Sequence, residues 1–365
     1  MPMRILFALA GLHRVNRGAE VAFISTGAEL ARAGHEVTLI GSGLEIAGQP
    51  YRFRHAPCIP RERFEGFPKL PFLRQETAWE ELTFLPGLLA RYNPRDYDVT
   101  LTCGFPFTNV ALRRPPTLGR RPKHVFVTEN GDWPAYSNDA EYRLFGCDGL
   151  ICTNPDYFER NRAKYHCALI PNGVDLTRFS PGSAARDRFG LDPSRPLVLM
   201  ASALIASKHV DVAIEAVSAI PEAKLVVAGD GPLRDQLARQ AEARMPGRYR
   251  QMRVAPSDMP DLYRSADVFL HLSKDESFGN VFVEALATGT PIVAYELSRT
   301  RWIVGDCALL ADPAEPSDLV RQINSALQPA SRRRQAAIQR ASEFSWTSVA
   351  SQYGRFLQSI MDESS

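Results

Sequence analysis

What this 365-residue chain lacks disfavours several classes of protein. None of its six cysteines lies in a Cys-x-x-Cys pair, and no apolar run is long enough to cross a bilayer. The formal net charge is only +2, so the charge balance does not point to a nucleic-acid partner, and we predict none. No Gly-x-Gly-x-x-Gly follows an expected strand, which disfavours a simple dehydrogenase. The cysteines are therefore predicted to be buried, reduced thiols.

The start of the chain lacks the features of a signal peptide. Met1–Ala10 is a short apolar run that contains Arg4, and a glycine turn follows it without a small-residue cleavage site. We interpret this run as the first buried strand. The interpretation predicts a soluble, cytoplasmic protein.

The chain is rich in short apolar runs that alternate with helical segments. Hydrophobic residues make up 45% and charged residues 23%, and 365 residues exceed what one hydrophobic core usually holds. The alternation predicts an α/β fold of doubly wound parallel sheets. Strands are predicted at Ile5–Ala10, Val37–Ile40, Val99–Thr102, Val125–Thr128, Leu150–Cys152, Leu197–Ala201, Lys224–Ala228, Asp267–His271 and Pro291–Ala294. By contrast, the proline- and arginine-rich stretch Tyr51–Pro94 is predicted to be irregular.

Two such series of elements occur, and a turn-rich stretch separates them. Pro171–Pro196 contains Pro171-Asn172-Gly173 and Ser180-Pro181-Gly182, which favour turns and indicate a linker. We therefore predict two tandem Rossmann-like domains, at residues 1–170 and 171–345. Residues 346–365 are predicted to form an amphipathic helix whose apolar side chains need a surface to cover.

The segment Asp275–Val293 carries the most informative chemistry. It leads from a strand through a loop into a helix that is expected to begin near Gly279. The backbone N–H groups of that first turn predict a phosphate site, because both the donors and the helix dipole favour an anion. Glu276 precedes the turn, and Glu284 lies about one and a half turns inside the helix. Since a carboxylate accepts hydrogen bonds from two vicinal hydroxyls, the pair suits a sugar and a ribose.

Glu276 and Glu284, with seven residues between them, resemble the Glu-x7-Glu motif of retaining glycosyltransferases of the GT-B fold, family 4 (glycosyl transferases group 1). The spacing alone is more typical of a solvated helix face. The context favours the functional interpretation, because Ser277-Phe278-Gly279 precedes the helix, Ala287–Pro291 follows it, and a strand is expected on each side.

Other segments resemble motifs of this family in the same order. They are Met3–Leu6 with Arg17-Gly18-Ala19-Glu20, Gly34-His35-Glu36-Val37, Pro171–Asp175 with Phe179 and Pro181, and Val226–Pro232. The resemblance spans almost the whole chain. It implies an N-terminal acceptor-binding domain, a C-terminal donor-binding domain and a C-terminal helix that packs back on the N-terminal domain. It also implies sugar transfer with retention of configuration from a nucleotide diphosphate donor, expected to be a UDP- or GDP-sugar.

The resemblance implies roles for individual residues. Glu276 would bind the sugar, Glu284 the ribose, and Lys208 would stabilise the departing diphosphate, so Glu276 and Lys208 are the catalytic candidates. The further donor-binding candidates are Gly18, Ser277, Phe278, Gly279 and Asn280. We predict no metal ion and no cofactor, because the nucleotide-sugar is a substrate and its charge would be countered by Lys208 and the helix N-terminus.

In two places the chain departs from the family's pattern. Ala203 stands where an arginine that neutralises the diphosphate is expected, and Arg253 or Arg17 is our candidate substitute. A histidine that contacts the sugar is expected after the strand Val125–Thr128, but Glu129-Asn130 occupies that place. Glu129, Asn130 and Arg17 are our candidates for contact with the sugar or the acceptor. Capping of the loop is the alternative role for Asn130.

Basic and aromatic side chains alternate in the stretch Arg52–Leu85. This pattern suits a charged acceptor or an anionic membrane surface, and a solvated basic loop is the alternative. We expect a glycan, a lipid-linked or a small-molecule acceptor. Peripheral contact with an anionic membrane at its inner face is a further hypothesis.

Two other functions remain open at this stage. A sugar-nucleotide epimerase of the same fold would share the tandem sheets and the donor site, although Glu276-Ser277-Phe278-Gly279 favours transfer. A non-catalytic subunit that binds a sugar nucleotide would also fit a chain that lacks the family's arginine and histidine.

Overall fold

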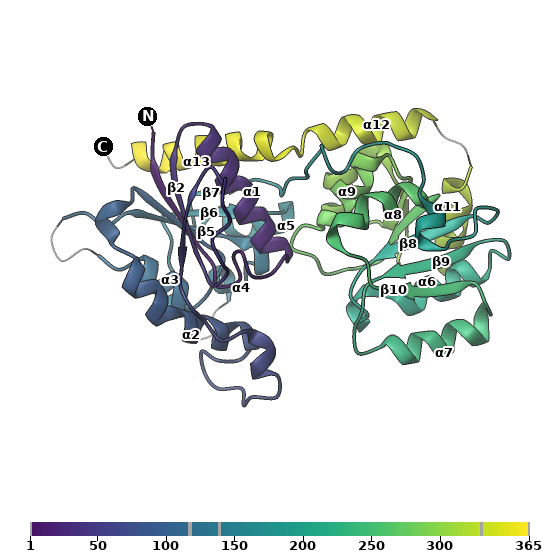
Figure 1. Cartoon of the computed structure of the whole chain (residues 1–365), viewed down its shortest axis with the longest axis horizontal. Coiled ribbons are helices and arrows are strands. Elements are labelled where there is room, and N and C mark those ends of the chain that lie inside the picture. The colour runs from purple at the N-terminus through teal and green to yellow at the C-terminus, as the bar shows by residue number, and fades with distance from the viewer. Residues whose placement is uncertain (1, 116–118, 138–139, 329–330, 364–365) are drawn as a thin grey trace. The chain divides into compact units, whose positions relative to one another are not determined.

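The computed structural model describes residues 2–115, 119–137, 140–328 and 331–363 (Figure 1). The chain divides into two compact units. One consists of Met1–Asn172 together with Trp346–Ser365, and the other of Gly173–Ser345. The chain therefore enters the second unit within the Pro171-Asn172-Gly173 turn and returns to the first for its last helix.

Within the described residues, the first unit contains a seven-stranded parallel sheet in the order β3-β2-β1-β4-β5-β6-β7. The first strand of the chain lies inside the sheet, because β1 pairs with both β2 and β4. The strand order reverses there, which is where ligands of doubly wound sheets usually bind. The strands are β1 (Arg4–Ala8), β2 (Glu36–Gly41), β3 (Arg52–His55), β4 (Val99–Thr102), β5 (Lys123–Val127), β6 (Gly149–Cys152) and β7 (Cys167–Leu169).

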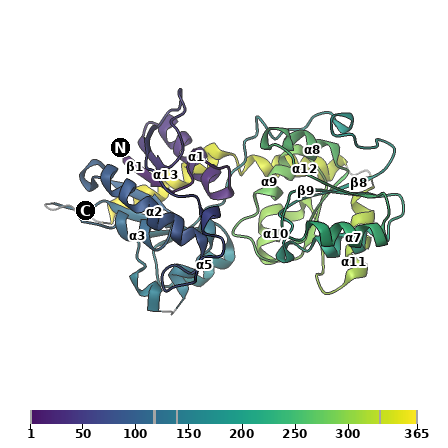
Figure 2. The ribbon, with the colours of Figure 1, turned by 60° about the horizontal axis from the view of Figure 1, so that its bottom comes forward.

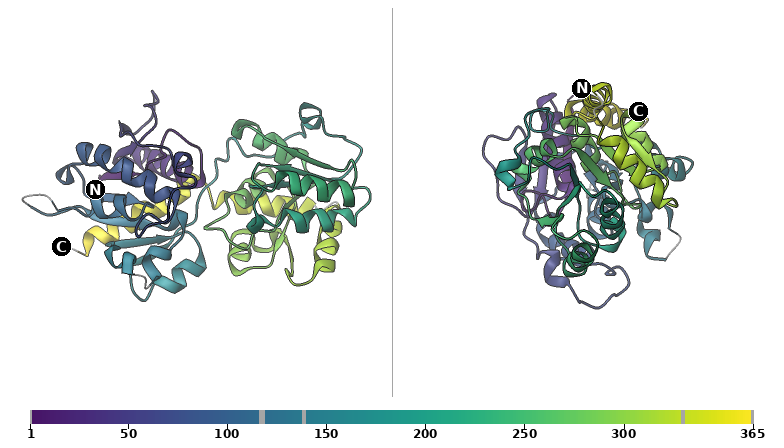
Figure 3. Two further views of the ribbon diagram at one scale, coloured as in Figure 1. Left: turned by 90° about the horizontal axis from the view of Figure 1, so that it is seen from below. Right: turned by 90° about the vertical axis from the view of Figure 1, so that its right-hand side faces the viewer.

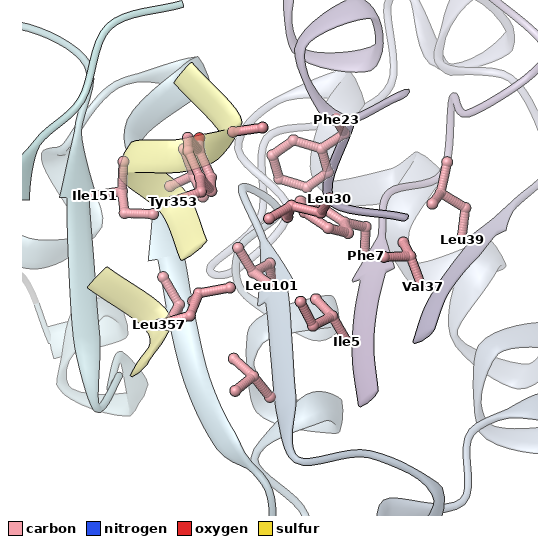
Figure 4. Close-up of a cluster of buried hydrophobic side chains, with 14 of the residues drawn as sticks. Ile5, Phe7, Phe23, Leu30, Val37, Leu39, Leu101, Ile151, Tyr353 and Leu357 are labelled. Carbon is pink, nitrogen blue, oxygen red and sulfur yellow. The ribbon is translucent and has the colours of Figure 1, made fainter. Parts of the chain in front are cut away.

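Helices cover both faces of this sheet. One face packs against α1 (Gly18–Arg32) and α13 (Trp346–Asp362), which lie side by side in Figures 1 and 2. Figure 4 shows Tyr353 and Leu357 of α13 directed towards side chains of the sheet. The other face packs against α2 (Glu76–Arg91) and α3 (Phe107–Leu112), and the short helices α4 (Trp133–Tyr136) and α5 (Pro155–Asn161) lie near β5 to β7. The amphipathic C-terminal helix thus buries its apolar stripe in the N-terminal core.

The prediction of an irregular stretch from Tyr51 to Pro94 is wrong in two places. Arg52–His55 forms the edge strand β3, and Glu76–Arg91 forms the 16-residue helix α2. The helical periodicity is hidden in the sequence because α2 buries Glu80 and Glu81 together with apolar side chains. Strands β7, β10 and β13 also escape prediction, because each has only three or four residues and is mostly half-buried.

The second unit is built in the same way. Within the described residues, its six-stranded parallel sheet has the order β10-β9-β8-β11-β12-β13. One face carries α6 (Val210–Ser218), α7 (Arg234–Arg244) and α11 (Pro316–Ala326), and the other carries α8 (Met259–Ser265), α9 (Asn280–Thr288), α10 (Ser298–Val304) and α12 (Ser331–Ser342). The strands are β8 (Leu197–Ala201), β9 (Lys224–Ala228), β10 (Tyr249–Met252), β11 (Val268–His271), β12 (Ile292–Tyr295) and β13 (Leu309–Ala311). Figure 3 shows helices on both sides of each sheet, which confirms the predicted pair of doubly wound α/β domains.

The six cysteines are free thiols, as predicted, but only Cys103 and Cys152 are buried and the other four are half-buried. None of the helices in the described part of the chain is both long enough and apolar enough to cross a membrane.

Candidate functional site

Lys208 and Glu276 meet at the carboxyl ends of two neighbouring strands of the second unit. Lys208 ends the short turn Ala206–Lys208 after β8, and Glu276 lies in the loop between β11 and α9. Because β8 and β11 are paired in parallel, both loops leave the same edge of the sheet. Lys208 Nζ forms an ion pair with Glu276 Oε1 and donates a hydrogen bond of 3.4 Å to Ser273 Oγ.

His271, the last residue of β11, completes this cluster. Its side chain is buried, and its Nε2 lies 3.3 Å from Glu276 Oε1. Although partial burial acts to raise the pKa of Glu276, His271 and Lys208 together lower it to about 2. Glu276 is therefore an anion and a pure hydrogen-bond acceptor at neutral pH. We did not select His271 from the sequence, and its place at a strand end five residues before Glu276 is the signal that could have found it.

Glu284 has a different environment on α9. Its Oε2 accepts a hydrogen bond of 2.8 Å from Tyr263 Oη, whose ring is fully buried. Burial raises the pKa of Glu284 to about 7, against the opposing effects of the Tyr263 hydrogen bond and of the positive charge on Arg178. One carboxylate of the motif is thus a permanent anion, while the other titrates near neutral pH.

The turn before α9 depends on Gly279. This residue caps the helix with a φ of 99°, and a Cβ added to it would lie 2.9 Å from the ring of Phe282. Both observations require glycine. Phe278 is buried beside Trp302 and Phe344, with ring centroids 6.1 Å apart in each case. The glycine turn and the buried ring together hold Glu276 at the edge of the sheet.

Arg253 lies one loop away from Ala203, the position that lacks the expected arginine. The loop after β9 packs closely against the loop after β8. A Cβ added to Gly229 would lie only 1.8 Å from the carbonyl oxygen of Ser202. Asp230 in the β9 loop pairs with Arg253, which follows β10 and whose side chain is 75% exposed. The β9 loop thus lies between Arg253 and Ala203, and the charge of Arg253 is matched by Asp230.

The candidates Arg17 and Gly18 belong to the first unit. Gly18 opens α1, and Arg17 precedes it. Arg17 is engaged by three carboxylates of its own unit, at 2.5 Å from Glu62, 3.8 Å from Glu80 and 3.9 Å from Glu20. These partners compensate its charge locally.

Glu129 and Asn130 form part of the turn Thr128–Asn130 that follows β5. Glu129 is buried, and its Oε2 accepts a hydrogen bond of 2.9 Å from Asn172 Nδ2. Its Oε1 is buried without a hydrogen-bond partner among the described residues. Burial raises the pKa of Glu129 to about 7. Asn130 Nδ2 lies 3.5 Å from Cys103 Sγ. Asn172 of the turn between the units thus holds Glu129, the residue that occupies the place of the expected histidine.

One Asp-x-Asp triplet, the usual signature of a metal-bound diphosphate, occurs in the chain at Asp96-Tyr97-Asp98. It precedes β4 and so lies at the amino end of that strand, opposite the edge that carries Glu129. Asp98 is occupied by an ion pair with Arg4, 2.7 Å from its Nη2. In the residues that the structure describes, no group of three or more His, Cys, Asp or Glu side chains is arranged to hold a metal ion. The chain therefore contains the signature, so the sequence does not exclude a metal-bound diphosphate on that ground. Metal independence stays a prediction.

Two family models match the chain in succession. The model of Glycosyltransferase Family 4 matches residues 16–178, and that of Glycosyl transferases group 1 matches residues 183–344. The chain belongs to the group 1, family 4 glycosyltransferases. Lys208, Glu276 and Glu284 all lie within the second match.

Two curated relatives of this family resemble part of the chain. It is 31% identical over 255 residues to mannosylfructose-phosphate synthase of Agrobacterium fabrum, covering 60% of this chain and 55% of that protein. It is also 34% identical over 215 residues to the GDP-mannose-dependent alpha-(1-6)-phosphatidylinositol dimannoside mannosyltransferase of Mycobacterium tuberculosis. This match covers 56% of this chain and 55% of that protein. The chain thus spans about half the length of the curated relatives it matches.

A solved structure resembles the whole chain. Sucrose-phosphate synthase from Thermosynechococcus elongatus matches with a TM-score of 0.78 and 19% identity, covering 99% of this chain and 100% of the other. At this identity the likeness shows the fold, which is the GT-B fold of two Rossmann-like domains.

Proposed function

We propose that this glycosyltransferase-family chain moves a sugar from a nucleotide diphosphate donor, a UDP- or GDP-sugar, to a glycan, lipid-linked or small-molecule acceptor. We further propose that transfer retains the anomeric configuration and needs no metal ion. The observation that carries the proposal is the cluster of Lys208, Glu276 and His271 at the ends of β8 and β11, next to the helix that bears Glu284. The name of the mycobacterial relative, which specifies GDP-mannose, supports a donor of this class.

Each part of the cluster suits one part of such a donor. Lys208 and the N-terminus of α9 offer positive charge to the diphosphate. Glu276 is ionised and held in place, so it accepts hydrogen bonds from sugar hydroxyls, while Glu284 accepts those of the ribose. When the bond from the sugar to the diphosphate breaks, negative charge grows on the departing phosphate oxygen. A fixed cation such as Lys208 stabilises that charge in the transition state.

A thermal-shift panel of UDP, GDP, ADP and dTDP with their common sugars, each with and without EDTA, tests donor binding. A ligand at 100 times its dissociation constant adds about 2.7 kcal/mol to the free energy of unfolding. We expect one nucleotide to raise the midpoint in the presence of EDTA and Glu284→Ala to abolish the rise. Glu242→Ala, which removes an exposed carboxylate of α7, is the matched control. A rise that EDTA removes would contradict metal independence, and no rise with any nucleotide would contradict donor binding.

Product analysis separates transfer from the two alternatives. With the donor identified, NMR of the product formed on an added acceptor should show the anomeric configuration of the donor. A changed donor sugar without an acceptor product would indicate an epimerase. Binding with neither transfer nor slow hydrolysis would indicate a binding subunit.

Contact with an anionic membrane is a separate part of the proposal. The segment before α2 exposes Phe67, Leu70 and Phe72 by 49%, 45% and 37%, with Lys69 between them and Arg63 four residues before Phe67. Exposed aromatic and basic side chains together favour an anionic lipid surface. Sedimentation with phosphatidylglycerol vesicles should exceed that with phosphatidylcholine vesicles, and equal sedimentation would contradict this part.

A further inference from the structure

A pocket in the first unit is lined by none of the donor-site candidates. Its volume is about 220 Å³, and it opens beside the segments that follow β4 and β5. Phe105 and Pro106 contribute from the first of these segments, and Trp133 and Tyr142 from the second. The remaining wall is residues 72–78, the segment that leads into α2. The pocket therefore lies at the carboxyl edge of the sheet, where ligands of doubly wound sheets bind.

Aromatic rings form rigid walls of this pocket. The ring of Trp133 lies 5.1 Å from that of Tyr142 and 5.9 Å from that of Phe105, at angles of 62° and 83°. The ring centroids of Phe105 and Tyr142 are 5.7 Å apart, with the rings tilted at 49°. The edge-to-face contacts of Trp133 are favourable and fix ring orientation. Gly131 has a φ of 110°, and a Cβ there would lie 2.9 Å from Trp133 Cδ1, so glycine is what lets the indole occupy this place.

The walls favour a particular chemistry. The electron-rich face of an aromatic ring attracts the weakly positive C–H groups on the apolar face of a saturated sugar ring. Arg74 is the one charged side chain among the described residues that line the pocket. A guanidinium is suited to bidentate hydrogen bonds with phosphate or carboxylate. The volume is below the roughly 300–1,000 Å³ of sites for drug-sized molecules, so the pocket suits a single ring.

We propose that this pocket binds the ring of the acceptor, and that the acceptor is a sugar or polyol ring that carries an anionic group held by Arg74. The proposal rests on the proposed glycosyltransferase function and narrows its acceptor class. The same chemistry is available from a free sugar phosphate and from the headgroup of a lipid, and the experiment distinguishes these two sources.

The test is a titration of tryptophan fluorescence with probes that differ in one feature each. Glucose 6-phosphate has the ring and the anion, glucose has only the ring, and glycerol 3-phosphate has only the anion. Phosphatidylcholine vesicles with phosphatidylinositol present an anionic ring on a lipid, and vesicles with phosphatidylglycerol present charge without a ring. We expect a saturable change in emission with glucose 6-phosphate or with the phosphatidylinositol vesicles, and at least tenfold weaker binding of the other probes. The probe that binds identifies the source.

Variants assign the response to the pocket. Trp133→Leu, measured by calorimetry because the substitution removes the reporting indole, should weaken binding at least fivefold. Tyr136→Ser removes a nearby exposed ring outside the pocket and should have no effect. Arg74→Gln should weaken binding of the anionic ring only, with Arg32→Gln, at an exposed arginine that ends α1 and lies outside the pocket lining, as its control. The arginine pair keeps the test decisive if Trp133→Leu folds poorly.

Several results would overturn the inference. One is that glucose or glycerol 3-phosphate binds as tightly as glucose 6-phosphate. Another is that the two kinds of anionic vesicle give the same response. The others are no response to any probe, or a response that Trp133→Leu and Arg74→Gln leave unchanged. The thermal shift with nucleotides is measured on the same proteins. If a pocket variant loses ring binding but keeps the thermal shift with nucleotide, the result supports the pocket. If the unmodified protein binds the ring but shows no thermal shift with any nucleotide, the result contradicts only the proposed donor binding.

Discussion

Lys208 and Glu276 form an ion pair although 68 residues separate them along the chain. Each leaves the carboxyl end of its own strand, and the two strands, β8 and β11, are neighbours in the sheet. Both side chains are largely buried, with 17% and 21% of their surface exposed. The pair therefore holds a cation and an anion ready at the place where a donor's diphosphate and sugar would meet.

Removal of the cation should affect the reaction more than the fold. We expect Lys208→Ala to lower kcat by about 10²–10³, the usual cost of losing one group that stabilises transition-state charge. Lys208→Arg should restore part of the rate because it keeps the charge. Lys224→Ala, whose lysine pairs with Asp192 elsewhere in the unit, is the control. Steady-state kinetics with unfolding midpoints checks this, and an unchanged kcat in Lys208→Ala would remove Lys208 from the proposed mechanism.

Nucleotide affinity should depend on the ionisation of Glu284. Its pKa is raised to about 7, so its carboxyl is largely protonated at pH 6 and accepts fewer hydrogen bonds from ribose. If only the ionised form binds, affinity rises about tenfold from pH 6 to pH 8. Glu284→Gln should bind weakly with a flat profile. Titrating the nucleoside in calorimetry avoids ionisation of the phosphates, and parallel profiles of both proteins would refute this role.

The hydroxyl of Tyr263 should influence the pKa of Glu284 and so the pH dependence of nucleotide binding. The hydrogen bond from Tyr263 lowers the pKa of Glu284, so Tyr263→Phe should move the pH profile of nucleotide binding upwards. The free energy of unfolding should fall by about 1–3 kcal/mol, because a buried acceptor loses its donor. Tyr249→Phe is the matched control, since the buried hydroxyl of Tyr249 has no partner among the described residues. Equal effects of the two variants on the pH profile would contradict the assignment.

The buried carboxyl of Glu129 should make stability depend on pH. Its folded pKa of about 7 exceeds its usual value of 4.5, so the folded state binds the proton more tightly. This contribution to stability is complete below pH 4.5 and is lost as pH rises through 7, at up to about 1.4 kcal/mol per pH unit for one proton. Glu129→Gln keeps an oxygen for Asn172 and should reduce the loss of stability between pH 6 and pH 8. Glu36→Gln, at an exposed site, should behave as the unmodified chain does in urea unfolding at both pH values.

Much of the proposed donor site could be predicted from sequence because its parts are local. The Glu276-x7-Glu284 spacing, the glycine turn at Gly279 and the flanking strands β11 and β12 all lie between Val268 and Tyr295, a continuous stretch whose pattern is visible without any long-range contact. The helix α2 could not be predicted in the same way, since two glutamates on its buried face disguise its period. His271 is visible in the sequence only as the last residue of a predicted strand, and its contact with Glu276 requires the fold.

Local patterns along the chain suffice to predict most of the alternation of strands, turns and helices, and the positions of the residues that follow those strands. Which of these residues meet depends on how distant segments pack together. Parallel strands bring their carboxyl ends to one edge, but the order β9-β8-β11 is set by packing between distant segments, and it is this order that places Lys208 beside Glu276. The surroundings then separate the pKa values of the two glutamates. His271 and Lys208 lower that of Glu276 to about 2 against the effect of its burial, whereas burial raises that of Glu284 to about 7, because a carboxylate's charge depends on its neighbours in space.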